Sequence, residues 1–278
     1  MNQELHCGRF RLSLARPLVM GIVNLTPDSF SDDGLGSDVE RAVAHARAQW
    51  EAGADILDVG AESSRPGAVP TPEDEELRRL IPVVSRIAEW GVPVSVDTYK
   101  PAVMRAAIAA GASLFNDISG LRHPGAIDVL RESDCGVCIM HMQGEPGSMQ
   151  AAPDYESVVD EVSGYLLARA QACREAGIAA GRIVLDPGFG FGKTLAHNLA
   201  LFRALTVMAA EGYPLLVGVS RKSMIGAITG RAVSERMPGS VAAAVLAASK
   251  GAKILRVHDV AATVDALKVW AAIEQGEY

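Results

Sequence analysis

The chain has 278 residues, of which 49% are hydrophobic and 21% charged, and its formal net charge is −7. This length is sufficient to bury a large core, and the acidic balance argues against a general affinity for nucleic acid, which is bound mainly through a surplus of Lys and Arg. The longest apolar runs, such as 241–248, fall far short of the roughly 20 residues that a membrane helix needs, so we expect no membrane span.

The first segment, Met1 to Phe10, has neither the basic start nor the apolar stretch of a signal peptide, which predicts a cytoplasmic protein. From His6 to Pro17 polar and apolar residues alternate. This pattern predicts a small β-hairpin, which would close the bottom of a barrel.

Eight short runs then have the nearly continuous apolar character of strands that are buried on both faces. They are 18–25, 54–60, 92–96, 113–118, 136–140, 183–185, 215–219 and 253–257. A glycine, typical of helix ends, precedes or opens each of the seven later runs, and the connections are long enough for parallel crossovers. The pattern predicts one α/β domain over residues 1–278, a (β/α)8 TIM barrel. An open doubly wound sheet is the alternative, but its glycine signature is absent after the first strand, where Ile22 and Val23 follow Gly21.

Several helix signals lie between these runs. Ser37 to Glu40 forms a capping box, and Thr71 stands as a cap residue before Pro72. Pro82 predicts a kink or a break within the following helix. The segment 239–249 is apolar on most sides, which indicates either a dimer interface or tight packing of small alanines against the barrel.

The four cysteines are too few and too irregularly spaced for a disulfide framework, so we expect reduced thiols. Cys135 and Cys138 form a Cys-x-x-Cys, which could be a redox pair or half of a zinc site. The residues between and after them have a strand pattern, and no second Cys or His pair has zinc-ligand spacing. Buried thiols are the favoured interpretation.

Each apolar run ends in polar residues, where barrel enzymes place their active sites. Asp97, Asn116 and Asp186 offer acceptors to a ligand that is rich in N–H groups, such as the edge of an amino-heterocycle. A second group offers positive charge for phosphate or carboxylate. Its members are Arg65, Lys222, Arg256 and His258.

Three long loops, 26–36, 61–70 and 141–154, would rise from the same face as binding loops. The segment 186–194 superficially matches a phosphate-binding P-loop, but Pro187 occupies the required first glycine position. Its glycines would instead let the backbone approach a flat ligand, on which Phe191 could stack. Helix starts after Ser220 and His258 would add N–H groups for an anion.

Seven segments resemble the signatures of the dihydropteroate synthase family and together span nearly the whole chain. They are MGIVNLTPDSFSD (20–32), DVGAESSRPG (58–67), SVDT (95–98), FND (115–117), DPGFGFGK (186–193), SRKS (220–223) and RVHD (256–259). The resemblance implies a transferase of folate biosynthesis, which condenses (7,8-dihydropterin-6-yl)methyl diphosphate with 4-aminobenzoate to give 7,8-dihydropteroate and diphosphate. It also implies Mg²⁺ as cofactor, a homodimer and inhibition by sulfonamides.

The resemblance assigns roles residue by residue. Asp97, Asn116, Asp186 and Lys222 would hold the pterin, and Ser64, Arg256 and His258 the diphosphate. Arg65, Pro66 and Ser223 would shape the 4-aminobenzoate site, and Asn24 would meet the metal ion. Lys222, Asp97, Asp186 and Arg65 would be the catalytic residues, with diphosphate departure preceding attack of the arylamine.

The chain departs from the family pattern at Ser64, where threonine is common, and at Ala61, where glycine is common. Since a hydroxyl is retained at Ser64, we expect its role to survive, with a change in loop packing or in tolerance of sulfonamides. A pterin-binding methyltransferase and a non-catalytic pterin-binding paralogue are the alternatives. The methyltransferase would have no use for the cations that the family directs at diphosphate.

Overall fold

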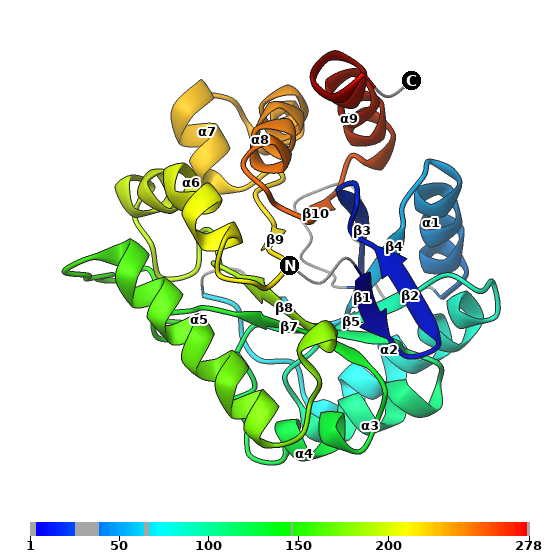
Figure 1. Cartoon of the computed structure of the whole chain (residues 1–278). Coiled ribbons are helices and arrows are strands. Elements are labelled where there is room, and N and C mark those ends of the chain that lie inside the picture. Colours follow the sequence, from blue (N-terminus) through cyan, green and yellow to red (C-terminus); the bar gives the residue numbers. More distant parts are fainter. Residues whose placement is uncertain (1–3, 26–38, 64–66, 146, 277–278) are drawn as a thin grey trace.

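Eight short parallel strands form the centre of the molecule, and helices surround them (Figure 1). The computed structural model describes residues 4–25, 39–63, 67–145 and 147–276. The strands are β3 (Leu18–Asn24), β4 (Ile56–Gly60), β5 (Val94–Asp97), β6 (Leu114–Asp117), β7 (Gly136–Met140), β8 (Ile183–Asp186), β9 (Leu216–Val217) and β10 (Ile254–Val257). They are hydrogen-bonded in the order β8-β7-β6-β5-β4-β3-β10-β9, and a bridge between Leu185 and Leu215 joins the two ends. The predicted barrel is confirmed.

The strands are short and almost entirely buried. Every residue of β4, β6, β7 and β8 is buried, because helices cover the outside of the sheet and side chains fill its inside. This explains why their sequences are nearly continuous apolar runs. β9 is shorter than the run 215–219 that predicts it. Leu215 lies just before β9, forms the bridge to Leu185, and its carbonyl accepts from the backbone N–H groups of Lys253 and Ile254.

The helices lie outside the strands. They are α1 (Val39–Glu51), α2 (Glu73–Ala88), α3 (Pro101–Ala109), α4 (Ala126–Arg131), α5 (Val158–Glu175), α6 (Leu195–Ala209), α7 (Ser223–Thr229), α8 (Met237–Ser249) and α9 (Val260–Gln275), with short 3₁₀ turns at Ala180–Arg182 and Val233–Glu235. The prediction of Thr71 as the cap of α2 was wrong, because the N-cap is Pro72. There is also no break at Pro82, since α2 continues through that residue. The capping box at Ser37 lies outside the described residues.

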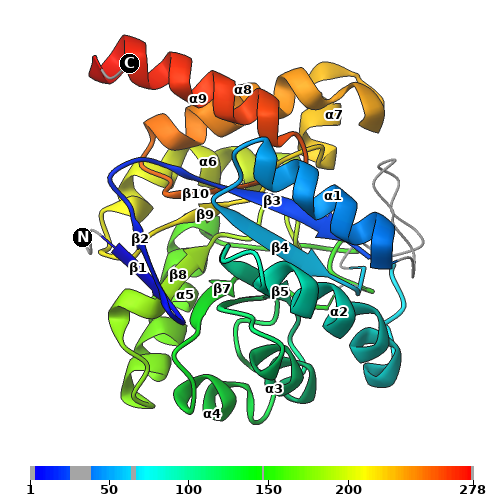
Figure 2. The same ribbon diagram turned by 90° about the vertical axis from the view of Figure 1, so that its right-hand side faces the viewer.

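The predicted N-terminal hairpin is present as β1 (Glu4–Cys7) and β2 (Phe10–Ser13). Leu5, Cys7 and Leu14 pack against side chains from the amino-terminal halves of the barrel strands, including Leu18 and Leu114. In Figure 2 the hairpin lies at the end of the barrel from which β3 and β4 point away. It therefore closes the bottom of the barrel, and the carboxyl ends of the strands open at the opposite face.

The cysteine and α8 predictions can also be compared with the structure. All four cysteines are free and buried, and Cys138 lies within β7, so the prediction of buried thiols is confirmed. Burial raises the pKa of the Cys7 thiol to about 12. On α8, Ala243, Ala244 and Ala247 are buried, whereas Leu246 is 55% exposed. Small residues thus pack one face of α8 against the protein, and its outer face remains apolar.

Candidate active site

A cavity of about 580 Å³ opens at the carboxyl ends of the strands, the face that the hairpin leaves open. Residues from β3, β5 and β10 and from the loops that follow β4, β8 and β9 line it. Seven of the predicted site residues are among them: Asn24, Asp97, Phe191, Lys222, Ser223, Arg256 and His258. Ser64, Arg65 and Pro66, by contrast, lie outside the residues that the structure describes.

Arg256 links two carboxylates across the centre of the barrel. Its Nε lies 2.6 Å from Oδ2 of Asp58, and its Nη2 lies 3.0 Å from Oδ2 of Asp97. Burial raises the pKa of Asp97 to about 7, and the charge of Arg256 opposes that shift. Burial alone would lower the pKa of Arg256, but the two carboxylates outweigh it and raise the value. The acceptor and cation groups predicted from the sequence therefore meet in space.

The other two predicted acceptors are buried beside this pair. Nδ2 of Asn116 donates to Oδ2 of Asp58 at 3.4 Å, and Oδ1 of Asp186 accepts from the backbone N–H of Gly188 at 2.7 Å. Within the described part of the chain, Oδ1 of Asn116 and Oδ1 of Asp58 are buried without a hydrogen-bond partner. Unpaired buried acceptors are costly, and so they point to N–H groups of a ligand.

Lys222 joins the loop after β9 to the glycine-rich loop after β8. Its Nζ donates to the carbonyl of Phe189 at 2.6 Å and lies 4.7 Å from the centre of the Phe191 ring. Burial lowers the pKa of Lys222 to about 8, while the carboxylate of Asp186 opposes the shift. Lys222 thus lies between the carboxylate of Asp186, which favours its charged form, and the aromatic face on which the sequence predicted stacking.

The glycine-rich loop is held by Lys193, which points into the protein. Its Nζ lies 2.9 Å from Nδ1 of His141 and donates to the carbonyl of Phe191 at 3.0 Å. Burial lowers the pKa of Lys193 to about 7 and that of His141 to about 3. A Cβ on Gly188, whose φ is +69°, would lie 1.9 Å from the carbonyl oxygen of His141, so the loop requires glycine there. Since Lys193 is only 3% exposed, it is no phosphate-binding lysine, and the rejection of a P-loop is supported.

The sequence analysis missed three cavity residues that come from less regular segments. Glu62 accepts hydrogen bonds from the hydroxyl of Tyr99 and from Lys100, and Arg236 donates to the carbonyl of Arg221 at 3.0 Å. Gln150 donates to the glycine-rich loop at Gly190. Glu62 lies within a quoted signature, and Gln150 lies within the predicted binding loop 141–154 although it was not singled out there. Nothing in the local sequence of Arg236 places it at the cavity.

The mouth of the cavity also contains His258, which follows β10. Its backbone N–H donates to Oγ of Ser220 at 3.2 Å, and its Nδ1 lies 3.1 Å from the same oxygen. Asn24 ends β3 on the same face. One cavity therefore offers the carboxylate of Asp97 together with cationic and hydroxyl groups.

The fold and this cavity define a barrel protein that is able to bind an N–H-rich, anionic small molecule at the carboxyl face of its strands. None of the described helices is both long enough and apolar enough to cross a membrane. Among the residues described, no cluster of three or more His, Cys, Asp or Glu side chains could hold a metal ion.

Comparison with known proteins identifies the family. A profile described as "Pterin binding enzyme" matches residues 20–258. A dihydropteroate synthase of Neisseria meningitidis serogroup C is 54% identical over 271 residues, which cover 96% of each chain. The structure of Xanthomonas albilineans dihydropteroate synthase with 4-aminobenzoic acid is 52% identical, with a TM-score of 0.92 over 99% of each chain. That of the Yersinia pestis enzyme in a sulfonamide drug complex is 45% identical, with a TM-score of 0.95 over 98% of this chain and 99% of the other. The chain belongs to the dihydropteroate synthase family of pterin-binding enzymes.

Proposed function

We propose that the protein condenses (7,8-dihydropterin-6-yl)methyl diphosphate with 4-aminobenzoate to form 7,8-dihydropteroate and diphosphate. The observation that carries this proposal is that Asp97 and the cationic groups Lys222 and Arg256 line one cavity, while unpaired acceptor oxygens of Asp58 and Asn116 are buried beside Arg256 and Asp97. The acceptors suit the N–H edge of a pterin, and the cations suit a diphosphate. Family membership supplies the reaction that uses both.

The acceptor side of the cavity would hold the pterin. Asp97, Asn116 and Asp186 would accept its N–H groups, and Phe191 would stack on its ring. A carboxylate has about four acceptor sites, so the contact between Asp97 and Arg256 leaves capacity for a ligand.

The cationic side would bind the departing diphosphate. Lys222 and His258 would face the charge that develops as the bond to the pterin methylene breaks, and Arg256, which also lines the cavity, would add positive charge near the same group. The 4-aminobenzoate would lie in a site formed by Ser223, Arg65 and Pro66. From there its amine would attack the methylene carbon that the diphosphate has left. In this proposal catalysis comes from placement and electrostatics and requires no covalent nucleophile.

Mg²⁺ fits the donors at the mouth of the cavity. This ion prefers oxygen ligands and is commonly held by one or two protein groups together with substrate phosphates. Asn24 offers an amide oxygen at the end of β3, where diphosphate would lie, and Ser64 would add a hydroxyl to the phosphate. When bound, the ion would neutralise charge on the leaving group.

We also expect a homodimer. Val207 of α6, Ile228 of α7, Leu246 of α8 and Val269 of α9 are each more than half exposed, and these helices are neighbours around the barrel (Figure 1). Exposed apolar side chains on adjacent helices are a candidate surface for association with another copy of the chain. Buried free thiols agree with a cytoplasmic location, and the 4-aminobenzoate site would accept sulfonamides.

The proposal is tested by incubating the purified protein with both substrates and Mg²⁺ and measuring dihydropteroate and released diphosphate. Equimolar formation of both is expected. Binding of the pterin diphosphate without product would indicate the non-catalytic paralogue. Binding of a reduced pterin with no effect of its diphosphate group would instead favour the methyltransferase.

A further inference from the structure

Arg221 has an unusual backbone conformation for a residue with a side chain. Its φ is +56°, in the left-handed region that non-glycine residues seldom adopt. Two groups hold that conformation: the backbone N–H of Arg221 donates to Oγ of Ser240 at 2.9 Å, and its carbonyl accepts from Nη1 of Arg236 at 3.0 Å. Such strain persists where the surrounding structure determines the conformation, and it clusters at functional sites.

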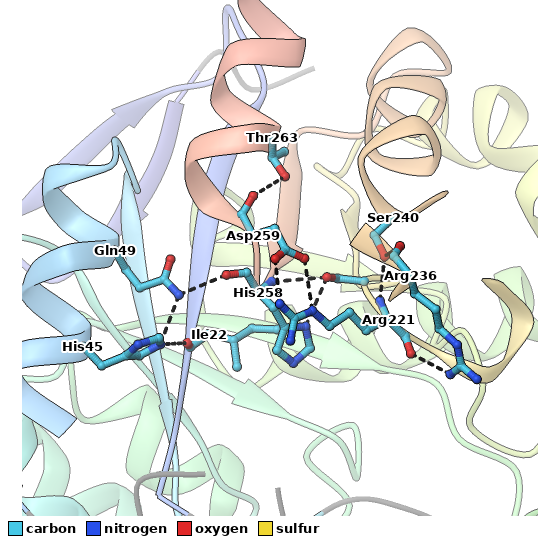
Figure 3. Close-up of polar contacts among 10 residues, drawn as sticks. Ile22, His45, Gln49, Arg221, Arg236, Ser240, His258, Asp259 and Thr263 are labelled. Carbon is cyan, nitrogen blue, oxygen red and sulfur yellow. Dashed lines mark hydrogen bonds and ion pairs between the residues drawn. The ribbon is translucent and has the colours of Figure 1, made fainter. Parts of the chain in front are cut away.

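The side chain of Arg221 forms a bidentate ion pair with the carboxylate of Asp259. Nε lies 3.1 Å from Oδ2, and Nη2 lies 2.7 Å from Oδ1 (Figure 3). The two side chains are 22% and 16% exposed, so solvent screens the pair only partly. Although Arg221 lines the cavity, its guanidinium is directed at a residue of the protein.

The pair joins two loops that carry the groups proposed to bind diphosphate. Arg221 lies between Ser220 and Lys222 after β9, and Asp259 follows His258 after β10. The contacts of Ser220 with His258 and of Arg221 with Asp259 therefore join consecutive residues of the two loops.

The loop after β10 is also held from its other side. In Figure 3, Gln49 of α1 donates to the carbonyl of His258 at 3.1 Å, and Thr263 of α9 donates to the carbonyl of Asp259 at 2.8 Å. The Arg221–Asp259 ion pair therefore adds a charged side-chain connection, beside the contacts of Ser220 with His258, between the loop after β9 and this fixed neighbour.

We propose that the Arg221–Asp259 ion pair is a positioning element that fixes Lys222 and His258 at the spacing needed for diphosphate departure. The left-handed turn at Arg221 leads from β9 directly into Lys222, the N-cap of α7. Loss of the pair would free this turn, and small displacements of groups that act in a transition state cost large factors in rate. The inference rests on the proposed function.

The test compares Arg221→Met, Asp259→Asn and the double variant with the wild-type protein. Each single variant should lower kcat by about 10- to 100-fold. The KM for the pterin diphosphate should rise only several-fold, in step with the weaker binding of its diphosphate group, because Asp97, Asn116 and Asp186 remain to hold the pterin. The double variant should be no slower than the worse single one, since both remove the same interaction.

Two controls separate the ion pair from general effects on the fold. Arg221→Gly keeps the left-handed backbone and removes the side chain, so it should be as impaired as Arg221→Met. Arg16→Met removes a similar bidentate ion pair, that of Arg16 with Asp55, at the opposite end of the barrel. This variant should leave kcat unchanged. Wild-type kcat in Arg221→Gly, or a double variant whose loss is the product of the single losses, would overturn the proposal.

Calorimetric titration with inorganic diphosphate and Mg²⁺ gives a readout that does not depend on turnover. The Arg221→Met and Asp259→Asn variants should bind diphosphate at least several-fold more weakly than Arg16→Met does. If the wild-type protein made no dihydropteroate, the proposed function would fail, and this comparison would still decide the positioning role. Equal affinities in all variants would contradict it.

Discussion

Replacement of Arg256 by methionine should destabilise the protein strongly. Methionine retains much of the length of the side chain but removes the cation between Asp58 and Asp97. Asp58 is fully buried, and breaking a buried ion pair from one side costs about 3–5 kcal/mol because a carboxylate is left without its partner. For a domain of this size the loss corresponds to a fall in Tm of roughly 6–20 °C.

Thermal unfolding followed by circular dichroism measures this effect. Asp58→Asn in the Arg256→Met background should recover part of the lost stability, since an amide needs no cation. Arg16→Met serves as the control, because an exposed pair contributes only about 0–1 kcal/mol. The reasoning is refuted if Arg256→Met lowers Tm no more than the control does, or if Asp58→Asn brings no recovery.

Three further predictions concern Lys193, the proposed catalytic residues Lys222 and Asp186, and the exposed face of α8. The pKa of Lys193 is about 7 in the folded chain and 10.5 as its ordinary value, so the unfolded chain binds more protons between these pH values and stability should rise with pH through this window. In chemical denaturation, the free energy of unfolding of the wild-type protein should rise by up to about 1.4 kcal/mol per pH unit, and Lys193→Met should lack this rise. Equal pH dependence in the two proteins would contradict the burial of a neutral Lys193. Lys222→Ala and Asp186→Ala should each lower kcat/KM by at least about 10²-fold with unchanged circular dichroism, and wild-type rates in both would refute their roles. Leu246→Glu should shift the protein from dimer to monomer in light scattering, whereas an unchanged mass would move the proposed interface elsewhere.

The sequence predicted the barrel because a strand that is buried on both faces has a nearly continuous apolar sequence. The runs that end at Gly60 and Met140 agree with the observed strand ends, and the hairpin follows from simple alternation. Local capping was harder to predict. The backbone N–H of Thr71 is 3.2 Å from Oε2 of Glu62, a residue nine positions earlier, and Pro72 rather than Thr71 takes the cap position.

The candidate site could be predicted as a set of residues but not as a set of contacts. The strand ends identify Asp97 and Arg256 as members, yet their ion pair depends on which strands become neighbours and on how far each side chain reaches. Arg236 reaches the cavity from the start of α8, and its role depends on the turn at Arg221. Such contacts are set by tertiary structure, which short sequence patterns do not encode.

The hairpin at the bottom of the barrel affects the route by which ligands enter and leave the cavity. With that end filled by Leu5 and Cys7, substrates and products must pass through the same mouth. The proposed pterin contacts, Asn116 and Asp186, are buried, whereas Ser223 is exposed at the rim. In the proposed reaction, a molecule seated at the rim would block the way to the base, and the pterin would therefore enter before 4-aminobenzoate. A barrel that is closed at one end, by the hairpin together with strand side chains such as Met20 and Ile56, would thus set the order of binding in the proposed two-substrate reaction.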